Sequence, residues 1–271
     1  MLYPAFLLGR ASFSRYSMTG LYQGPAGFAN YERLLAQPDL ATVVGNTVIW
    51  VTVIVAITMV ISLGLAHFLA RSFRGRRLVR FTLIVPWAAS LIMTSKLFVW
   101  IFDYYFGILN RVLQQVRLID HPVDWLGQDR TVMGAMIAVG IYVSLPFTTY
   151  VLLAGLQAIA RDVYEAARVD GASSWQTYRA VTLPLLRPAL LVAVVLNMVY
   201  VFNSFPIVWT LNDRNPGFQH DTMITYMYKL AFKSALRDVG VAAALGVVNV
   251  LAILVAVVIY LRTVRWREDA A

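Results

Sequence analysis

The chain has 271 residues, of which 59% are hydrophobic and only 14% are charged. Soluble domains average about 45–50% apolar and about 25% charged residues, so this composition excludes an ordinary soluble domain and indicates a polytopic membrane protein. The net charge of +9 comes without a basic patch interleaved with aromatic residues, so we expect no nucleic acid partner, and the absence of cysteine excludes disulfides and thiolate metal sites.

Apolar segments follow one another along the chain, and five of them are long enough to cross a bilayer. A membrane helix needs about 20 mostly apolar residues to span roughly 30 Å of hydrocarbon. The five candidates are residues 42–70, 81–102, 131–159, 189–209 and 239–261. Residues 1–9 are apolar but too few to span. We interpret them as the end of a helix whose beginning is missing, with an interfacial anchor as the alternative.

These segments predict an all-α membrane protein with about six transmembrane helices, the first one incomplete, in a single domain over residues 1–271. The loop RSFRGRRLVR at residues 71–80 holds five arginines, and its side of the membrane is the more basic one. Because basic loops stay in the cytoplasm, residues 160–187 and the C-terminus should lie inside. Residues 103–130 and 210–238 should then form short helices at the outer surface.

Residues 160–187 interrupt the apolar pattern with the charged sequence EAARVDGASSWQTYRAVTLPLLR, which starts at Glu165. Helical spacing extends over residues 157–170, and Gly171 is placed to end that helix in the left-handed conformation. Ser173 or Ser174 can cap a second helix.

The second helix should cover residues 175–182. Pro184 and Pro188 are expected to stop it before it enters the membrane. The product is a short helix–turn–helix at the cytoplasmic surface. An ordinary interfacial loop is the alternative that the charges alone would permit.

The spacing within this segment is also specific. Glu165-Ala166-Ala167, Gly171 and Val181-x-Leu183-Pro184 follow the pattern EAA–x3–G–x9–I–x–LP, with valine at the isoleucine position. This pattern resembles the EAA signature of permease subunits of binding-protein-dependent ATP-binding-cassette importers. The resemblance implies a type I importer fold in which the segment is a coupling helix that fits a cleft on a separate ATPase. It assigns the ATPase contact to Glu165, Ala166, Ala167, Arg168, Asp170, Gly171, Leu183 and Pro184, with Glu165 as the charged contact and Arg168 or Asp170 as alternatives.

Other parts of the chain are similar to one branch of this family. Residues 27–31 (GFANY) look like its outer-surface motif before the second span, and residues 203–217, 228–232 and 240–245 are similar to the maltose/glycerol-phosphate branch of carbohydrate importers, with a permease of the MalF or UgpA type. The resemblance implies a bacterial inner membrane location. The implied partners are a second, different permease subunit, two copies of the ATPase, an extracytoplasmic solute-binding protein and membrane lipid, with ATP and Mg bound by the ATPase and no cofactor bound by this chain.

Two other classes of function have little support in the residues. An ion-coupled secondary transporter needs ionisable groups within the membrane, yet the five spans hold no Asp or Glu, and Lys96 is the only charge well inside one. A membrane enzyme would need catalytic or metal-ligating spacing, but His67, His121 and His220 lie on separate segments, and we expect neither a catalytic residue nor a metal site. There is no GxxxxGK[ST] phosphate loop, so the chain should not hydrolyse ATP itself.

Polar and aromatic side chains in two spans predict a substrate path near the middle of the membrane. They are Tyr142, Ser144 and Phe147 around Pro146, and Asn197, Tyr200, Asn203 and Ser204. Asn197, Tyr200 and Ser204 have the spacing of one helical face. Amides, hydroxyls and aromatic rings suit a sugar, whereas hydrogen bonds between neighbouring helices are the alternative role. A glycerol-phosphate substrate would need basic groups, and Lys96 is the one intramembrane candidate.

Overall fold

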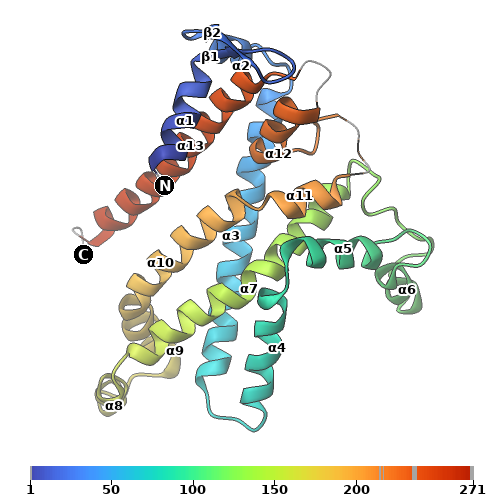
Figure 1. Cartoon of the computed structure of the whole chain (residues 1–271). Helices are drawn as coiled ribbons and strands as arrows, with labels where there is room; N and C mark the ends of the chain where they lie inside the picture. Colours follow the sequence, from blue (N-terminus) through green and yellow to red (C-terminus); the bar gives the residue numbers. More distant parts are fainter. Residues whose placement is uncertain (1, 214, 216, 234–236, 269–271) are drawn as a thin grey trace.

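Helices make up most of the structure, a computed structural model that describes residues 2–213, 215, 217–233 and 237–268 (Figure 1). In chain order the elements are α1 (Leu2–Ser12), β1 (Ser14–Tyr16), β2 (Tyr22–Pro25), α2 (Ala29–Leu35), α3 (Leu40–Ala70), α4 (Arg76–Ala88), α5 (Leu91–Ile101), α6 (Ile108–Gln115), α7 (Val132–Ala158), α8 (Arg161–Val169), α9 (Ser174–Thr177), the π-helical turn η1 (Tyr178–Thr182), α10 (Leu183–Phe202), α11 (Phe205–Leu211), α12 (Met223–Tyr228), the π-helical turn η2 (Lys229–Lys233) and α13 (Val239–Glu268). The antiparallel β1–β2 hairpin is a small addition to the predicted all-α fold.

Four helices of the described chain are long and apolar enough to cross a membrane: Leu40–Ala70, Asp129–Ala158, Ser174–Phe202 and Val239–Thr263. Three of them match the predicted spans 42–70, 131–159 and 239–261 closely. The helical prediction for residues 1–9 is confirmed by α1, which packs along α13. The short helices expected within residues 103–130 and 210–238 are present as α6 and α12.

The predicted span 81–102 is wrong as a single helix. The structure divides it into α4 and α5, because Ala89 and Ser90 both take extended backbone conformations. The last turn of α4 contains Pro86, which has no backbone N–H to donate. Serine is favoured at helix starts, and Ser90 occupies the position before α5.

The prediction that Pro184 and Pro188 stop the amphipathic helix is also wrong. α9, η1 and α10 follow one another without a break, so one helix runs from Ser174 to Phe202. The Leu183 N–H bonds to the carbonyl of Tyr178, five residues back, and this widened turn lies directly before Pro184. Pro184 falls in the first turn of α10, where a missing donor is tolerated.

The predicted span 189–209 is therefore shifted, and it ends early. α10 stops at Phe202, and the chain restarts as α11 at Phe205. The Ser204 hydroxyl donates to the Val201 carbonyl at 2.6 Å, and the Asn203 amide donates to Val199 at 2.8 Å. The same two carbonyls also accept the backbone N–H groups of Asn203 and Ser204 at 3.2 Å, so these side chains add second hydrogen bonds to the last turn of α10.

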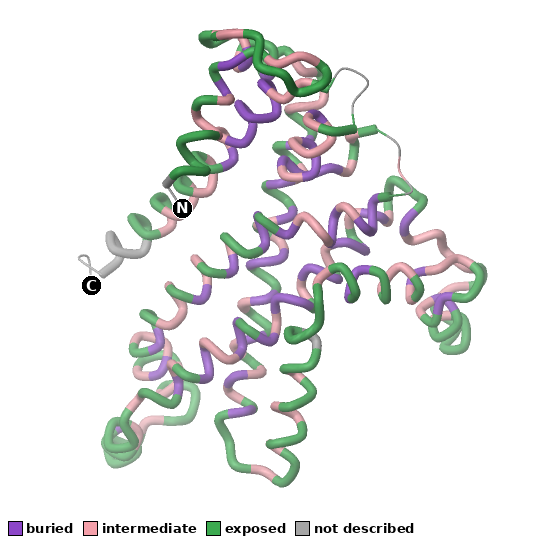
Figure 2. Tube along the Cα trace, viewed as in Figure 1, coloured by how far each residue is buried: buried purple, intermediate pink, exposed green. Residues whose placement is uncertain are grey.

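The packing centres on α3 and α7, which lie against each other and against α10. The Trp50 indole of α3 is buried, and it donates to the Val201 carbonyl near the end of α10 at 2.9 Å. A second cluster joins α2, α3, α12 and α13 around Leu34, Tyr226 and Leu245. Exposed residues continue along the outer sides of the long helices (Figure 2), as expected for surfaces that meet lipid or other subunits.

The two ends of α3 carry different structures (Figure 1). The β1–β2 hairpin, α2 and α12 lie near its first turns, whereas α8, α9 and the α3–α4 turn lie at its other end. Asn30, within the GFANY sequence, is fully buried and donates to the carbonyls of Ser12 and Ser14 at 2.8 and 2.9 Å. These bonds join α1, the hairpin and α2 into one unit.

Gly155 of α7 allows the close approach of α10, and this contact yields a stability prediction. A Cβ at this position would overlap the Cβ of Ala189 and lie 2.9 Å from the Leu186 Cδ1. We expect Gly155→Ala to lower stability by about 1–3 kcal/mol, because the two helices must separate. Thermal unfolding of the purified protein in detergent measures the effect.

Gly134→Ala is the matched control, since Gly134 lies on the same helix and an added Cβ there meets nothing within 4 Å. This control should unfold at or slightly above the temperature of the unmodified protein, because alanine favours helices. Equal unfolding temperatures for the Gly155 and Gly134 variants would contradict the packing argument.

Candidate functional site

The segment from α8 to η1 has well-defined helix ends. The N–H of Gly171 bonds to the Arg168 carbonyl at 3.1 Å, and the N–H of Ala172 bonds to the Ala167 carbonyl at 3.0 Å. This pair of bonds is a Schellman motif, which needs a left-handed residue at the glycine position. Gly171 has φ +76°, and a Cβ there would meet nothing within 4 Å. Glycine is therefore favoured at position 171 by the left-handed backbone conformation, and not by a lack of space for a side chain within this chain.

A capping box starts the second helix of the segment. The Ser173 hydroxyl accepts from the Gln176 N–H at 3.3 Å, while the Gln176 side chain accepts from the Ser173 N–H at 2.8 Å. Of the two predicted caps, Ser173 is the one used, and Ser174 is the first residue of α9. The first helix is shorter than its spacing predicted, because α7 ends at Ala158 and α8 starts at Arg161.

Most residues with a predicted ATPase contact are accessible in this chain. Glu165, Ala166, Arg168, Asp170 and Gly171 are exposed, Leu183 and Pro184 are half-buried, and Ala167 is buried. Two large apolar side chains lie among these charges: Val169 is 87% exposed and Trp175 is 67% exposed. Such a mixture of exposed apolar and charged side chains is typical of a protein-binding surface.

The coupling segment, here residues 160–187, is attached to the rest of the chain mainly through its second half. α8 packs on η1, and the hydroxyls of Tyr164 and Thr182 lie 3.5 Å apart. A cavity of 1320 Å³ lies between the segment and the last turns of α3, with Leu63 and His67 on the α3 side. His67 meets the Tyr178 ring edge-on, with 4.9 Å between ring centroids. The first helix of the segment thus depends on η1 for its position.

The predicted substrate-path residues divide by exposure. Tyr142 and Phe147 on α7 and Tyr200 on α10 are 40%, 36% and 37% exposed. The rings of Tyr142 and Phe147 contact Phe98 and Trp87, respectively. These exposed rings could meet a solute or a partner subunit.

The remaining path residues have less access. Ser144 and Asn197 are 3% and 1% exposed, so a solute cannot reach them in this conformation. The predicted face of Asn197, Tyr200 and Ser204 does not form, because α10 ends at Phe202 and the buried Ser204 caps it. Asn203 is exposed at the same break.

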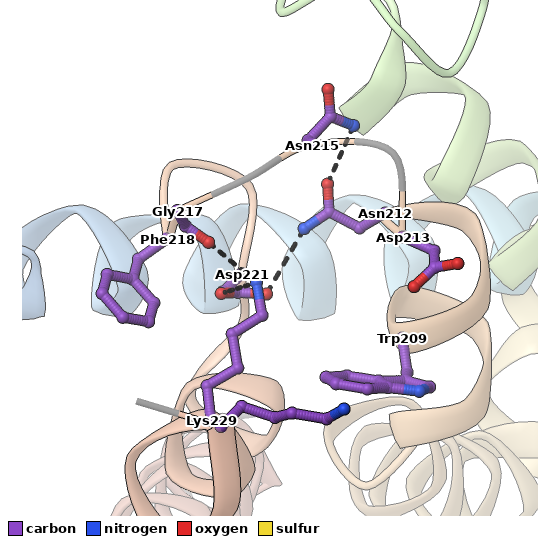
Figure 3. Close-up of a pocket in the computed structure, with 9 residues that line it drawn as sticks. Trp209, Asn212, Asp213, Asn215, Gly217, Phe218, Asp221 and Lys229 are labelled. Carbon is purple, nitrogen blue, oxygen red and sulfur yellow. Dashed lines mark hydrogen bonds and ion pairs between the residues drawn. The ribbon is translucent and has the colours of Figure 1, made fainter. Parts of the chain in front are cut away.

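Sequence reasoning missed a cavity of 340 Å³ between α11 and the start of α12 and η2 (Figure 3). The Lys229 ammonium lies 2.7 Å from the Asp221 carboxylate and donates to the Gly217 carbonyl at 2.7 Å. The Asn212 amide donates to the other Asp221 oxygen at 3.3 Å, and Asn215 donates to Asn212 at 3.1 Å. Asn212 and Asn215 come directly after a predicted span, so the sequence shows their place along the chain. Their approach to Asp221 and Lys229 depends on tertiary structure, which the sequence pattern does not show.

Within the described residues, the requirements of a metal site are not met. Among residues 2–213, 215, 217–233 and 237–268, no three His, Asp or Glu side chains come together in a way that could hold a metal ion. His220 instead lies 2.9 Å from the Asp129 carboxylate at the surface.

Within the described residues, four apolar helices, with an exposed, glycine-terminated helix between two of them, define a multi-pass membrane protein. The chain belongs to the family of binding-protein-dependent transport system inner membrane components, whose family model matches residues 58–267. It is 39% identical over 234 residues to a probable ABC transporter permease protein of Brucella suis, which covers 86% of this chain and 80% of the relative. It is 32% identical over 244 residues to the trehalose/maltose transport system permease protein MalF of Thermococcus litoralis, with 90% and 81% covered.

A solved structure agrees with the fold. The chain superposes with a TM-score of 0.84 and 23% identity on a chain of the crystal structure of a bacterial ABC transporter involved in the import of the acidic polysaccharide alginate, with 98% and 89% of the two chains covered. This superposition confirms the predicted type I importer fold, and the family model and the named relatives confirm the resemblance to sugar importer permeases.

The buried Tyr226 beside this cavity yields a pH prediction. Burial, and then the charges of Asp39 and Asp221, raise its pKa to about 12 from the ordinary value of 10.0. The folded state therefore keeps this proton to a higher pH than the unfolded chain. The resulting stability is complete below about pH 10 and is lost as the pH rises towards 12.

We expect the unfolding temperature of the purified protein to fall between about pH 10 and about pH 12, and to fall less in Tyr226→Phe, which cannot ionise. The other tyrosines contribute equally to both proteins, so the difference isolates Tyr226. Parallel declines in the two proteins would show that Tyr226 titrates as an ordinary tyrosine.

Proposed function

We propose that this protein is the membrane-spanning permease subunit of an ATP-driven bacterial importer that translocates a saccharide delivered by an extracytoplasmic binding protein. Two copies of a cytoplasmic ATPase supply the energy and bind ATP and Mg, and a second, different permease subunit completes the path. The chain itself carries no catalytic step. Its place is the bacterial inner membrane, with the coupling segment and the C-terminus in the cytoplasm.

The observation that carries this proposal is the unbroken helix that starts in the coupling segment. α8 presents Glu165, Arg168 and Asp170 to the outside, and Gly171 turns the chain directly into the helix Ser174–Phe202. A force applied at α8 therefore reaches the interior of the bundle without crossing a flexible loop. An ordinary interfacial loop would not need this connection.

The mechanism that follows is a mechanical one. ATP closes the two ATPase subunits, and each draws with it the coupling helix that it holds. α9, η1 and α10 carry that displacement to the Asn203–Ser204 break, where the helix ends and α11, packed on α5 and α7, begins. The path then alternates between inward-open and outward-open states, a two-state equilibrium biased by ligand binding.

A saccharide is the substrate class that the side chains favour. Exposed rings at Tyr142, Phe147 and Tyr200 offer flat apolar surfaces, and Asn203 offers an exposed amide. Among its relatives, one is named for trehalose/maltose transport, which supports the same class. A glycerol-phosphate substrate would need a surplus of basic groups, and Lys96 on α5 is the one candidate that the five predicted spans offered.

The importer reconstituted in proteoliposomes with its ATPase, second permease and binding protein tests the proposal. Gly171→Val should reduce ATP-dependent uptake of labelled saccharide by roughly tenfold, because a left-handed conformation costs a side chain with a Cβ about 1–2 kcal/mol and valine pays this in full. Gly171→Asn should retain most uptake, since asparagine tolerates that conformation.

Gly20→Val is the matched control for strain alone. Gly20 also has a positive φ, +82°, with nothing within 4 Å of an added Cβ, but it lies in the β1–β2 hairpin at the other end of the molecule. Uptake should persist in this variant. If Gly171→Val transports as well as the unmodified importer, the coupling role of the segment is refuted.

A further inference from the structure

Two adjoining cavities share the side chains of Trp209 and Asp213. The larger, of 340 Å³, lies towards Lys229 and Lys233, and the smaller, of 290 Å³, lies towards Lys96 on α5. Resting on the function proposed above, we propose that these cavities bind two consecutive sugar units of a neutral oligosaccharide, one on each side of Trp209. The predicted substrate path does not include this site, because it lies beyond the Asn203–Ser204 break.

The Trp209 ring is held in place by its neighbours. Phe205 stacks on it, with 5.4 Å between ring centroids and 15° between the ring planes, and Tyr228 meets it edge-on at 4.9 Å. Phe232 packs in turn on Tyr228 at 5.1 Å. A fixed aromatic face suits the apolar face of a sugar ring, because little conformational freedom is lost on binding.

Fixed polar groups complete the larger cavity (Figure 3). The Asp221 carboxylate is held by Lys229 and Asn212, and Asn215 bonds to Asn212. Asp221 and Asn212 are only 1% and 4% exposed, so their role is to hold Lys229 and Asn215 in position. Lys229, Asn215 and the exposed Asp213 are the groups that a sugar can reach, and together they offer donors and an acceptor to its hydroxyls.

The charges favour a neutral ligand. The two cavities together hold three lysines, Lys96, Lys229 and Lys233, and two carboxylates, Asp221 and the shared Asp213, so their joint charge is +1. A surplus of one charge is smaller than the cluster of basic groups that an anionic sugar or a phosphate ester would favour.

The position of the site fits the first contact of a sugar with this subunit. Asn46 donates to the Asp221 carbonyl at 3.1 Å, and the Thr47 hydroxyl accepts from the Met223 N–H at 2.8 Å, which places the larger cavity near the start of α3. Ala70 and Arg71, at the other end of α3, line the cavity beside the coupling segment. At about 1.5 Å per helical residue, Asn46 and Ala70 are about 36 Å apart along α3, comparable to the thickness of the membrane.

The test uses the complete importer in nanodiscs, without the binding protein, and measures the equilibrium binding of labelled disaccharides. The probes are maltose, trehalose, cellobiose and a disaccharide that contains glucuronate, and ATP-dependent uptake of the same sugars in proteoliposomes is measured in parallel. Trp209→Ala should weaken binding of the imported neutral disaccharide roughly fivefold, and Trp209→Phe should restore most of the affinity.

Asp213→Ala supplies a second variant, because Asp213 is exposed and its removal should not disturb folding. It should weaken binding by roughly three- to tenfold. Trp100→Ala is the matched control: Trp100 is 72% exposed on α5 and lines neither cavity, so affinity should not change.

The possible outcomes separate the two proposals. If neutral disaccharides are imported and both Trp209→Ala and Asp213→Ala leave their affinity unchanged, the site is refuted while the importer function stands. If Trp209→Ala prevents assembly, Asp213→Ala decides the question by the same measure. Preferential binding of the glucuronate disaccharide would refute the neutral ligand, and the absence of ATP-dependent uptake of any saccharide would refute the importer function itself.

Discussion

The continuity of the helix from Ser174 to Phe202 is the constraint on which the rest of the structure depends. A helix carries displacement along its axis because each turn is bonded to the next. The one irregular turn, η1, keeps that continuity, since the Leu183 N–H still bonds to the Tyr178 carbonyl. Had Pro184 ended the helix, α8 could move without moving α10, and an exposed docking helix would have no mechanical consequence inside the bundle.

Hydrogen bonds also fix the C-terminal end of that helix, at Phe202. Trp50 on α3 binds the Val201 carbonyl, and the side chains of Asn203 and Ser204 satisfy carbonyls of the last turn of α10. Packing and this hydrogen bond therefore fix the position of the end of α10 relative to α3. In the proposed mechanism a displacement of α10 meets the break before α11, and α11 is the element that carries Trp209.

Polar side chains differ in exposure between residues 160–187 and the network around Asp221. In the coupling segment charged side chains are exposed, so they are available to a partner without a large desolvation cost. Around Asp221 and Lys229 they are paired with one another, with Asp221 buried and Lys229 half-buried, which fixes their geometry. The first arrangement suits docking of a protein, and the second suits recognition of a small polar solute.

Composition and spacing alone determined much of this protein. Runs of apolar residues predicted α3, α7 and α13, since a helix in lipid must be apolar throughout. Gly171 and Ser173 predicted the ends of α8 and α9, because these residue types act through local backbone geometry. The EAA spacing also indicated the family.

Only the tertiary structure decided the points that depend on how helices meet. Pro184 and Pro188 predicted an end of the helix, yet the π-helical turn η1 allows the helix to continue into the bundle. The prediction that Asn197, Tyr200 and Ser204 share one helical face is wrong, because α10 ends at Phe202, before Ser204. The cavity beside Trp209 joins residues from α5, α11 and η2, and no local pattern records which distant segments will lie together. Helix type is set by local periodicity, whereas breaks and shared cavities are set by packing between segments.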